Sequence, residues 1–111
     1  MAVSEIQMYD MGAGTYDLNK SIFSGYTTGS GNYLYIFIPG RFPSNLTATI
    51  SIQGMQISLE SGQLSQANID TSYTPVLEIT QFGIRVELKF TSTQGAYKPL
   101  TTNIQGSLTL T

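Results

Sequence analysis

Apolar and polar residues alternate with a period of two through most of this chain. The alternation is clearest over residues 46–53, 55–60, 84–91 and 104–111, where every second position is mostly apolar. A period of two places one set of side chains in a core and the other in solvent, so each run predicts a half-buried β-strand. Gly54 separates the first two runs, and Gly106 falls on the apolar side of the last run. A glycine in that position predicts a bulge or a close backbone contact.

Turn-forming residues separate these runs at short intervals. Gln81-Phe82-Gly83 predicts a tight hairpin between strands at 76–80 and 84–91, with Gly83 supplying a positive φ. No window repeats every 3.6 residues with capping residues at its ends, so helix is limited to a turn or two, over 64–69. The predicted fold class is all-β, an antiparallel β-sandwich or jelly roll of about seven to eight short strands.

The first 32 residues have a different pattern from the rest. Two glycine-rich stretches lie at 11–14 and 27–31, and we expect strands at 3–9 and 21–26. Glycine-rich connections are natural positions for binding loops, but an arm that only fills a sheet edge explains the same pattern. We assign 1–32 to the same domain as a sandwich core at 33–111, because 111 residues leave no room for a second domain.

The segment 33–38 departs from the alternation. In a strand, its aliphatic residues point to one face and its aromatic residues point to the other. The aromatic row consists of Tyr33, Tyr35 and Phe37. Either the strand is central and covered on both faces, or the row faces outward. An outward row favours contact between subunits over contact with a ligand, because Tyr offers a large area with few rotatable bonds.

The chain carries little charge. Only 11% of its residues are charged, against about 25% in average soluble proteins. Ser, Thr, Asn and Gln supply the polarity. Removing water from such a neutral surface costs less free energy than removing it from a surface rich in Lys and Glu. The five basic residues are spread along the chain and the net charge is −2, which predicts no nucleic-acid partner. No signal-peptide pattern begins the sequence and no stretch reaches membrane-spanning length, so we expect no membrane insertion.

The chemistry available to the chain is narrow, since it contains no His and no Cys. Their absence removes the commonest general base, metal ligands and thiol nucleophile. A two-carboxylate glycosidase is the main enzyme class that remains, with Glu78 and Glu87 as its natural pair across the predicted hairpin. The nearby Arg85 and Lys89 favour a cross-strand ion pair on a solvated face instead. We therefore predict a non-enzymatic protein with no catalytic residue and no cofactor.

Two acidic loops offer oxygen ligands of the kind that Ca²⁺ binds. They lie at 10–14 and 17–19, and their spacing matches no EF-hand loop. Asp and Asn in turns more often bond their own backbone, so we expect no metal site.

Seven tyrosines without a tryptophan favour a second interpretation. Aromatic rings stack on the apolar face of a pyranose, while amide and carboxylate side chains bond its hydroxyl groups. Tyr16, Tyr26, Tyr73 and Tyr97 lie beside Gly, Pro, Ser or Thr in expected loops, as candidate ligand contacts or as ordinary surface residues. The absence of Trp argues mildly against a dedicated carbohydrate-binding module, which stays as the alternative function.

Four features of the stretch 19–111 follow one another in a distinctive order. A Tyr-rich strand ends in Ile-Pro at 33–39, and a Thr- and Ser-alternating strand follows at 46–53. A charged alternating strand occupies 84–90, and the segment 99–111 consists of a Pro-Leu-Thr linker followed by the final strand. In this order the stretch resembles the small C-terminal β-domains of bacteriophage tail-fibre and baseplate proteins. That group shares no site motif with this chain, so the resemblance assigns no functional residue.

The resemblance implies a non-enzymatic structural or receptor-binding module of a virion. It implies a homo-oligomer, a trimer above other states, in contact with other virion proteins and with a host-surface glycan as a further candidate partner. Such a protein is made in the host cytoplasm without a signal peptide and ends in the virion. Few charges protect the expected strand edges outside 85–89, and a closed oligomer buries such edges together with the aromatic row.

Overall fold

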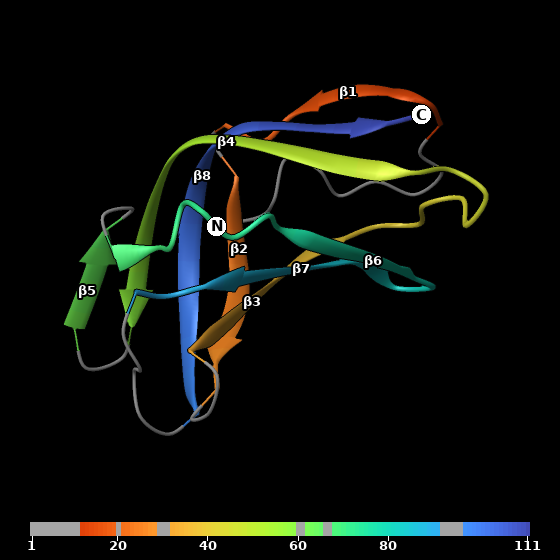
Figure 1. Cartoon of the computed structure of the whole chain (residues 1–111). Helices are drawn as coiled ribbons and strands as arrows, with labels where there is room; N and C mark the ends of the chain where they lie inside the picture. The colour runs from red at the N-terminus through yellow and green to blue at the C-terminus, as the bar shows by residue number, and fades with distance from the viewer. Residues whose placement is uncertain (1–11, 20, 29–31, 60–61, 66–67, 92–96) are drawn as a thin grey trace.

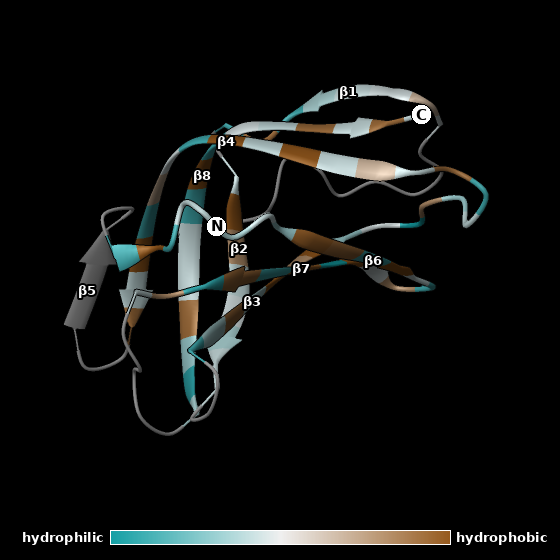
Figure 2. Ribbon diagram, in the orientation of Figure 1, coloured by the Kyte–Doolittle hydropathy of each residue, from teal (hydrophilic) through white to brown (hydrophobic). Residues whose placement is uncertain are grey.

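The computed structural model describes residues 12–19, 21–28, 32–59, 62–65, 68–91 and 97–111. Within these ranges the chain forms eight β-strands and no α-helix (Figure 1). The strands are β1 (Gly14–Asp17), β2 (Ile22–Thr27), β3 (Tyr33–Pro39), β4 (Ala48–Leu59), β5 (Gly62–Ser65), β6 (Val76–Thr80), β7 (Gly83–Lys89) and β8 (Lys98–Leu110). The alternation of the sequence is visible along β4 and β8, where brown and pale or teal segments follow one another (Figure 2).

The strands belong to one antiparallel sheet that folds over itself. Its order is β5-β4-β8-β2-β3-β7-β6, and β1 pairs separately with the end of β8. The long strands β4 and β8 pair along most of their length and bend together. Beyond the bend they form, with β1, a layer above β6 and β7 in Figure 1, and β4 and β6 are in contact. The predicted all-β sandwich class is confirmed, although two of its strands are long and the layers share one sheet.

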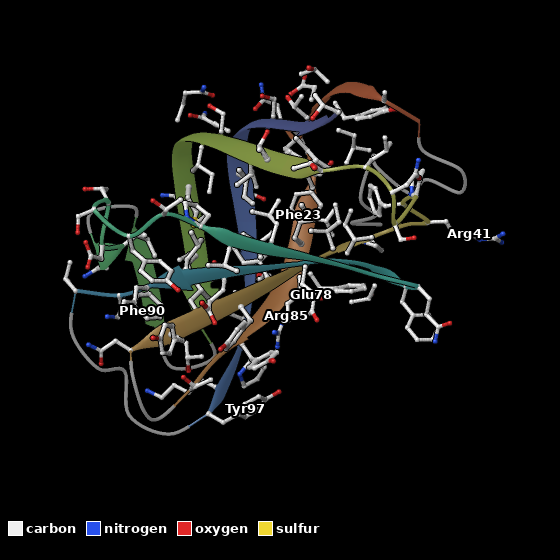
Figure 3. All side chains as sticks on the ribbon, turned by 45° about the vertical axis from the view of Figure 1, so that its right-hand side comes forward. Phe23, Arg41, Glu78, Arg85, Phe90 and Tyr97 are labelled. Carbon is white, nitrogen blue, oxygen red and sulfur yellow. The ribbon has the colours of Figure 1, made fainter. Side chains whose placement is uncertain are left out.

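The hydrophobic core lies between these two layers. Its wholly buried side chains come from most of the strands and include Phe23, Leu34, Ile36, Ile57, Ile84, Val86, Phe90, Ile104 and Leu108. Figure 3 shows Phe23 near the middle of the fold and Phe90 toward the left side of the view. Because Ile104 and Leu108 lie on either side of the bend in β8 and are both buried, this strand ties the two layers into one core.

A β-bulge accommodates the bend in β4. The register with β8 shifts between Ile52 and Gly54, so that Gln53 is the extra residue. The bulge explains why the apolar positions change from even numbers at Ile52 to odd numbers at Met55 while both side chains remain at the core. Without the extra residue one of the two apolar sets would point into solvent.

Gly106 accommodates the bend in β8. It is buried, and a Cβ there would lie 1.9 Å from the carbonyl oxygen of Ser51 in the paired strand. Only glycine permits so close an approach of two backbones. The close backbone contact predicted at Gly106 is therefore confirmed.

The predicted hairpin is also confirmed. β6 and β7 pair from Val76↔Glu87 to Thr80↔Gly83, with Gln81 and Phe82 in the turn. Gly83 has φ 155°, the positive value that the turn was expected to need.

Two expectations about local structure were wrong. The expected helical turn at 64–69 is not formed at its start, because 62–65 is β5 and satisfies its backbone hydrogen bonds along the free edge of β4. The expected Pro-Leu-Thr linker is part of β8, which begins at Lys98. Pro99 fits in the strand because the pairing of β4 with β8 stops at Leu59↔Leu100, so no donor is needed on that side. The strand expected at 3–9 lies outside the described residues.

Candidate functional site

The aromatic row of β3 faces outward. β3 lies between β2 and β7 in the sheet, and its aliphatic side chains are buried on the core side. Tyr33, Tyr35 and Phe37 lie half-buried on the opposite side. Of the two predicted arrangements, the outward row is the observed one, with partial cover from neighbouring side chains. The described part of the N-terminal segment forms β1 and β2, which pair within the sheet instead of lying over this row, and residues 1–11 lie outside the described ranges.

Five of the seven tyrosines meet on this outer face and form a continuous strip. The ring of Tyr26 in β2 stacks on that of Tyr35, with centroids 5.2 Å apart, and lies 5.5 Å from that of Tyr97. Tyr33 lies 6.4 Å from Tyr35 and 6.1 Å from Tyr73, which it meets edge-on. These separations are those of favourable aromatic pairs. We call this set of five residues the tyrosine strip.

Two cations on β7 cover rings of the strip. The guanidinium carbon of Arg85 lies 4.8 Å from the ring centroid of Tyr35, and the Lys89 Nζ lies 5.6 Å from that of Tyr33. Tyr35 therefore has Arg85 from β7 on one side and Tyr26 from β2 on the other, since β3 lies between those two strands. Each contact attracts a cation to the face of a ring and so favours this arrangement of the side chains.

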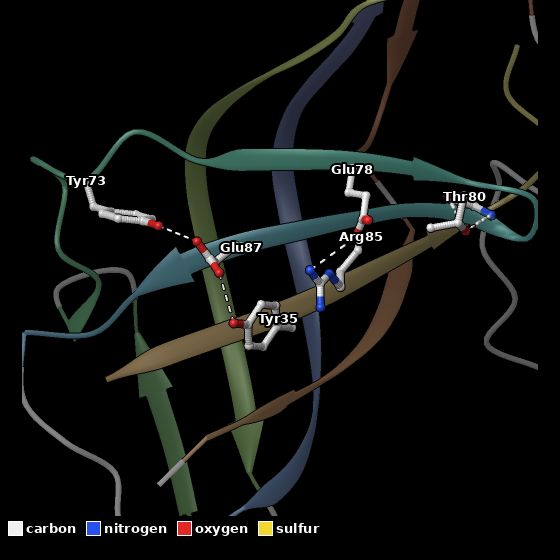
Figure 4. A network of polar contacts seen from close by, with 7 residues as sticks. Tyr35, Tyr73, Glu78, Thr80, Arg85 and Glu87 are labelled. Atoms are coloured by element: carbon white, nitrogen blue, oxygen red, sulfur yellow. Dashed lines mark hydrogen bonds and ion pairs between the residues drawn. The ribbon is translucent and has the colours of Figure 1, made fainter. Parts of the chain in front are cut away.

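Glu87 fixes two hydroxyl groups of the strip. It lies between Arg85 and Lys89 on β7, and its two oxygens accept hydrogen bonds from Tyr35, at 2.9 Å, and from Tyr73 (Figure 4). The hydrogen bond to this carboxylate raises the pKa of Tyr73 to about 12. Burial, and then the bond to Glu87, raise the pKa of Tyr35 as well. Both rings thus stay neutral and anchored through the ordinary pH range.

The two glutamates of the hairpin have different partners. Glu78 lies opposite Arg85 in the register of β6 and β7, and the two form an ion pair of 3.1 Å (Figure 4). The predicted cross-strand ion pair is therefore confirmed for Glu78. Glu87 lies opposite Val76 and bonds tyrosines instead, so the hairpin does not place the two carboxylates directly across from one another. The arrangement gives no support to a two-carboxylate mechanism.

An open hollow of about 540 Å³ adjoins the strip. Its described lining includes Ser24 and Gly25 of β2 and Ile36 of β3. Larger side chains stand around them: Tyr26, Tyr35, Phe37, Arg85 and Tyr97. Tyr97 is 64% exposed and Figure 3 shows it projecting from the fold on the same side as Arg85. On this outer face the short side chain of Ser24, opposite Phe37 in the register, lies among larger side chains, and the depression forms there.

Six of the seven predicted binding residues thus share one face, although they come from separate parts of the sequence. The exception is Tyr16 in β1, which packs against the core and donates its hydroxyl hydrogen to the Gly12 carbonyl oxygen at 2.8 Å. Sequence reasoning missed Glu87 and Ser24 as parts of this surface. The sequence pattern placed both residues on expected strands, but it did not show which strands pair with one another.

The loop oxygens considered for Ca²⁺ accept hydrogen bonds from backbone N–H groups where they are described, one local and one distant. Asp17 accepts a hydrogen bond from the Asn19 backbone at 2.9 Å, and the Asn19 side chain accepts one from Gly106 at 3.0 Å. Asp70 accepts two from Ser72, which lower its pKa. No group of three or more acidic side chains suited to a metal ion occurs among the described residues. The described ranges also contain no helix long and apolar enough to cross a membrane.

Comparison with known proteins finds little. No family model and no curated protein sequence matches the chain. Among solved structures it is similar to a CBM3a-L domain with flanking linkers from the scaffoldin cipA of the cellulosome of Clostridium thermocellum. The two are 17% identical with a TM-score of 0.27, and the match covers 88% of this chain and 51% of that one. A TM-score this low carries no argument about what this chain binds.

Proposed function

We propose that this protein is a non-catalytic carbohydrate-binding module and that the tyrosine strip with its hollow is the ligand surface. The observation that carries the proposal is the gathering of five tyrosines from distant segments on one outer sheet face. Core packing does not require them there, because the apolar side chains of the same strands fill the opposite face.

The chemistry around the strip suits a sugar. A pyranose has an apolar face, which an aromatic ring covers, and a rim of hydroxyl groups, which need hydrogen-bond partners. Neutral polar side chains extend the face beyond the strip: Ser24 on β2 pairs with Thr101 on β8, and Asn103 follows Thr101 on the same side. All three are exposed. The rings are held by stacking and by Glu87 before any ligand arrives, so little ordering cost accompanies binding.

A matched pair of exposed aromatic residues tests the proposal. Tyr97 belongs to the strip and is 64% exposed, whereas Phe82 lies in the β6–β7 turn, is 70% exposed and is not a member of the strip. We expect Tyr97→Ala to weaken binding to an oligosaccharide identified on a glycan array by about tenfold or more, which corresponds to the loss of one stacking contact. Phe82→Ala should bind normally. An array with no signal for the unmodified protein, or equal losses in both variants, would refute the proposal.

A virion structural module remains the second candidate function. Besides the strip, the described surface exposes Ile22, Val76 and Phe82, and apolar side chains of this kind are covered at subunit contacts. This candidate requires a homo-oligomer, and a trimer above other states. Sedimentation at micromolar concentration separates the two: a trimer favours the virion module, and a monomer that binds sugar leaves only the carbohydrate-binding module.

A further inference from the structure

The hollow beside the strip has a distinctive charge as well as a shape. Among the described residues that line it, Arg85 is the only charged one, and the others are aromatic, aliphatic, Ser24 or Gly25. Neither Glu78 nor Glu87 lines it. Although the whole chain has a net charge of −2, this depression combines aromatic walls with one cation.

Arg85 is held in a way that leaves it available to a ligand. Its guanidinium group lies over the ring of Tyr35, which restricts the plane of the group. A guanidinium carries five N–H donors in a planar fork, and the ion pair with Glu78 joins one of its nitrogens to one carboxylate oxygen. The side chains of Arg85 and Glu78 are 45% and 59% exposed, so an incoming group reaches this pair from solvent.

We propose that the hollow selects acidic sugars, in which the pyranose ring rests against Tyr97 and Tyr26 while its carboxylate bonds Arg85. This inference rests on the carbohydrate-binding function proposed above and names its ligand class. A carboxylate matches the fork of a guanidinium with two parallel hydrogen bonds, which are stronger than bonds to neutral groups. A neutral sugar keeps the ring contact and the hydrogen bonds of its hydroxyl groups but lacks this charged pair of bonds.

Glu78 has a defined part in this account. It competes with the ligand carboxylate for Arg85, because both are anions that bond the same guanidinium. Glu87 does not compete, since its oxygens accept from Tyr35 and Tyr73. Removing the charge of Glu78 should therefore strengthen the binding of acidic sugars, and removing the charge of Arg85 should weaken it.

The test compares one ligand in two forms: a uronate oligosaccharide and its carboxyl-reduced, neutral counterpart, each titrated by calorimetry. We expect the acidic form to bind about tenfold more tightly or better. Arg85→Gln should remove that preference, Arg85→Lys should keep only part of it, and Glu78→Gln should raise the affinity for the acidic form. Arg41→Gln is the control, because Arg41 is exposed and lies well away from Arg85 and Tyr97 (Figure 3).

The outcomes separate the two proposals. Equal affinity for both forms, or a preference that survives Arg85→Gln, overturns the acidic-sugar inference and leaves the carbohydrate-binding function intact. Absence of binding to either form, together with an empty glycan array, overturns both. Circular dichroism of each variant confirms that it is folded, and the gain expected of Glu78→Gln cannot arise from misfolding.

Discussion

The two faces of β3 differ in what holds them. On the core side, the side chains of Leu34, Ile36 and Ile38 are wholly buried and apolar. On the outer side, Tyr33 and Tyr35 are half-buried and are held by neighbouring rings, by two cations and by Glu87. Removing apolar area from water stabilises the first face. The second face gains less of this stabilisation because it is only half-buried. The two faces of one strand therefore differ in role: one maintains the fold and the other offers a surface.

The largest expected effect is on the core side. Ile36→Ala removes a wholly buried side chain and leaves a cavity, so the free energy of unfolding should fall by about 2–5 kcal/mol. Urea denaturation at neutral pH measures it. A loss below about 1 kcal/mol would mean that the core collapses around the cavity and that the contrast between the faces is smaller than the burial indicates.

The next effect concerns the tyrosine hydroxyls at high pH. In the unfolded chain these groups lose their protons near pH 10, whereas in the folded protein the pKa of Tyr73 is about 12 and that of Tyr35 is raised. Their contribution to stability is therefore complete below about pH 10 and is lost as the pH rises through the folded pKa values. Denaturation followed across this range, alongside tyrosinate absorbance, should show the decline.

Glu87→Gln should make that decline shallower, because it removes the charge that holds both hydroxyls neutral. Glu78→Gln is the matched control, since Glu78 bonds Arg85 and neither tyrosine. If the two variants decline with the same slope as the unmodified protein, the tyrosine hydroxyls do not stabilise the strip through Glu87.

The smallest expected effect on stability is at the exposed end of the strip. Tyr97→Ala should change the free energy of unfolding by no more than about 0.5 kcal/mol, because surface substitutions away from the core rarely do more. Thermal unfolding of this variant beside Ile36→Ala measures the contrast. A loss comparable to that of Ile36→Ala would show that the strip is part of the stabilising core.

Local pattern predicted the elements of the fold better than their assembly. Alternation placed Tyr33, Tyr35 and Phe37 on one face, and the turn chemistry of Gly83 located the hairpin, because both depend on neighbours in sequence. β5 was missed because its four residues form a strand only through pairing with the edge of β4. Such pairing is a long-range property that propensity does not report.

The candidate site was predictable in its members but not in its geometry. Tyr26, Tyr73 and Tyr97 were recognised one by one as loop aromatics, although Tyr26 lies in β2. Their meeting with the aromatic row depends on which segments lie beside β3. The same strand order brings Arg85 against Tyr35. The positive charge in the hollow therefore could not be predicted from the sequence either. Tyr16 met the same sequence criteria and packs against the core instead.

The central claim is that ligand contact belongs to the outer face of β2, β3 and β7. Chemical-shift mapping by NMR during titration with a uronate oligosaccharide tests it most directly. We predict shifts at Ser24, Tyr26, Tyr35, Arg85 and Tyr97, with little change in β1 or at the buried Leu108, which does not line the hollow. Saturation without shifts at these residues, or shifts confined to β1 or to the edge strand β5, would contradict the account.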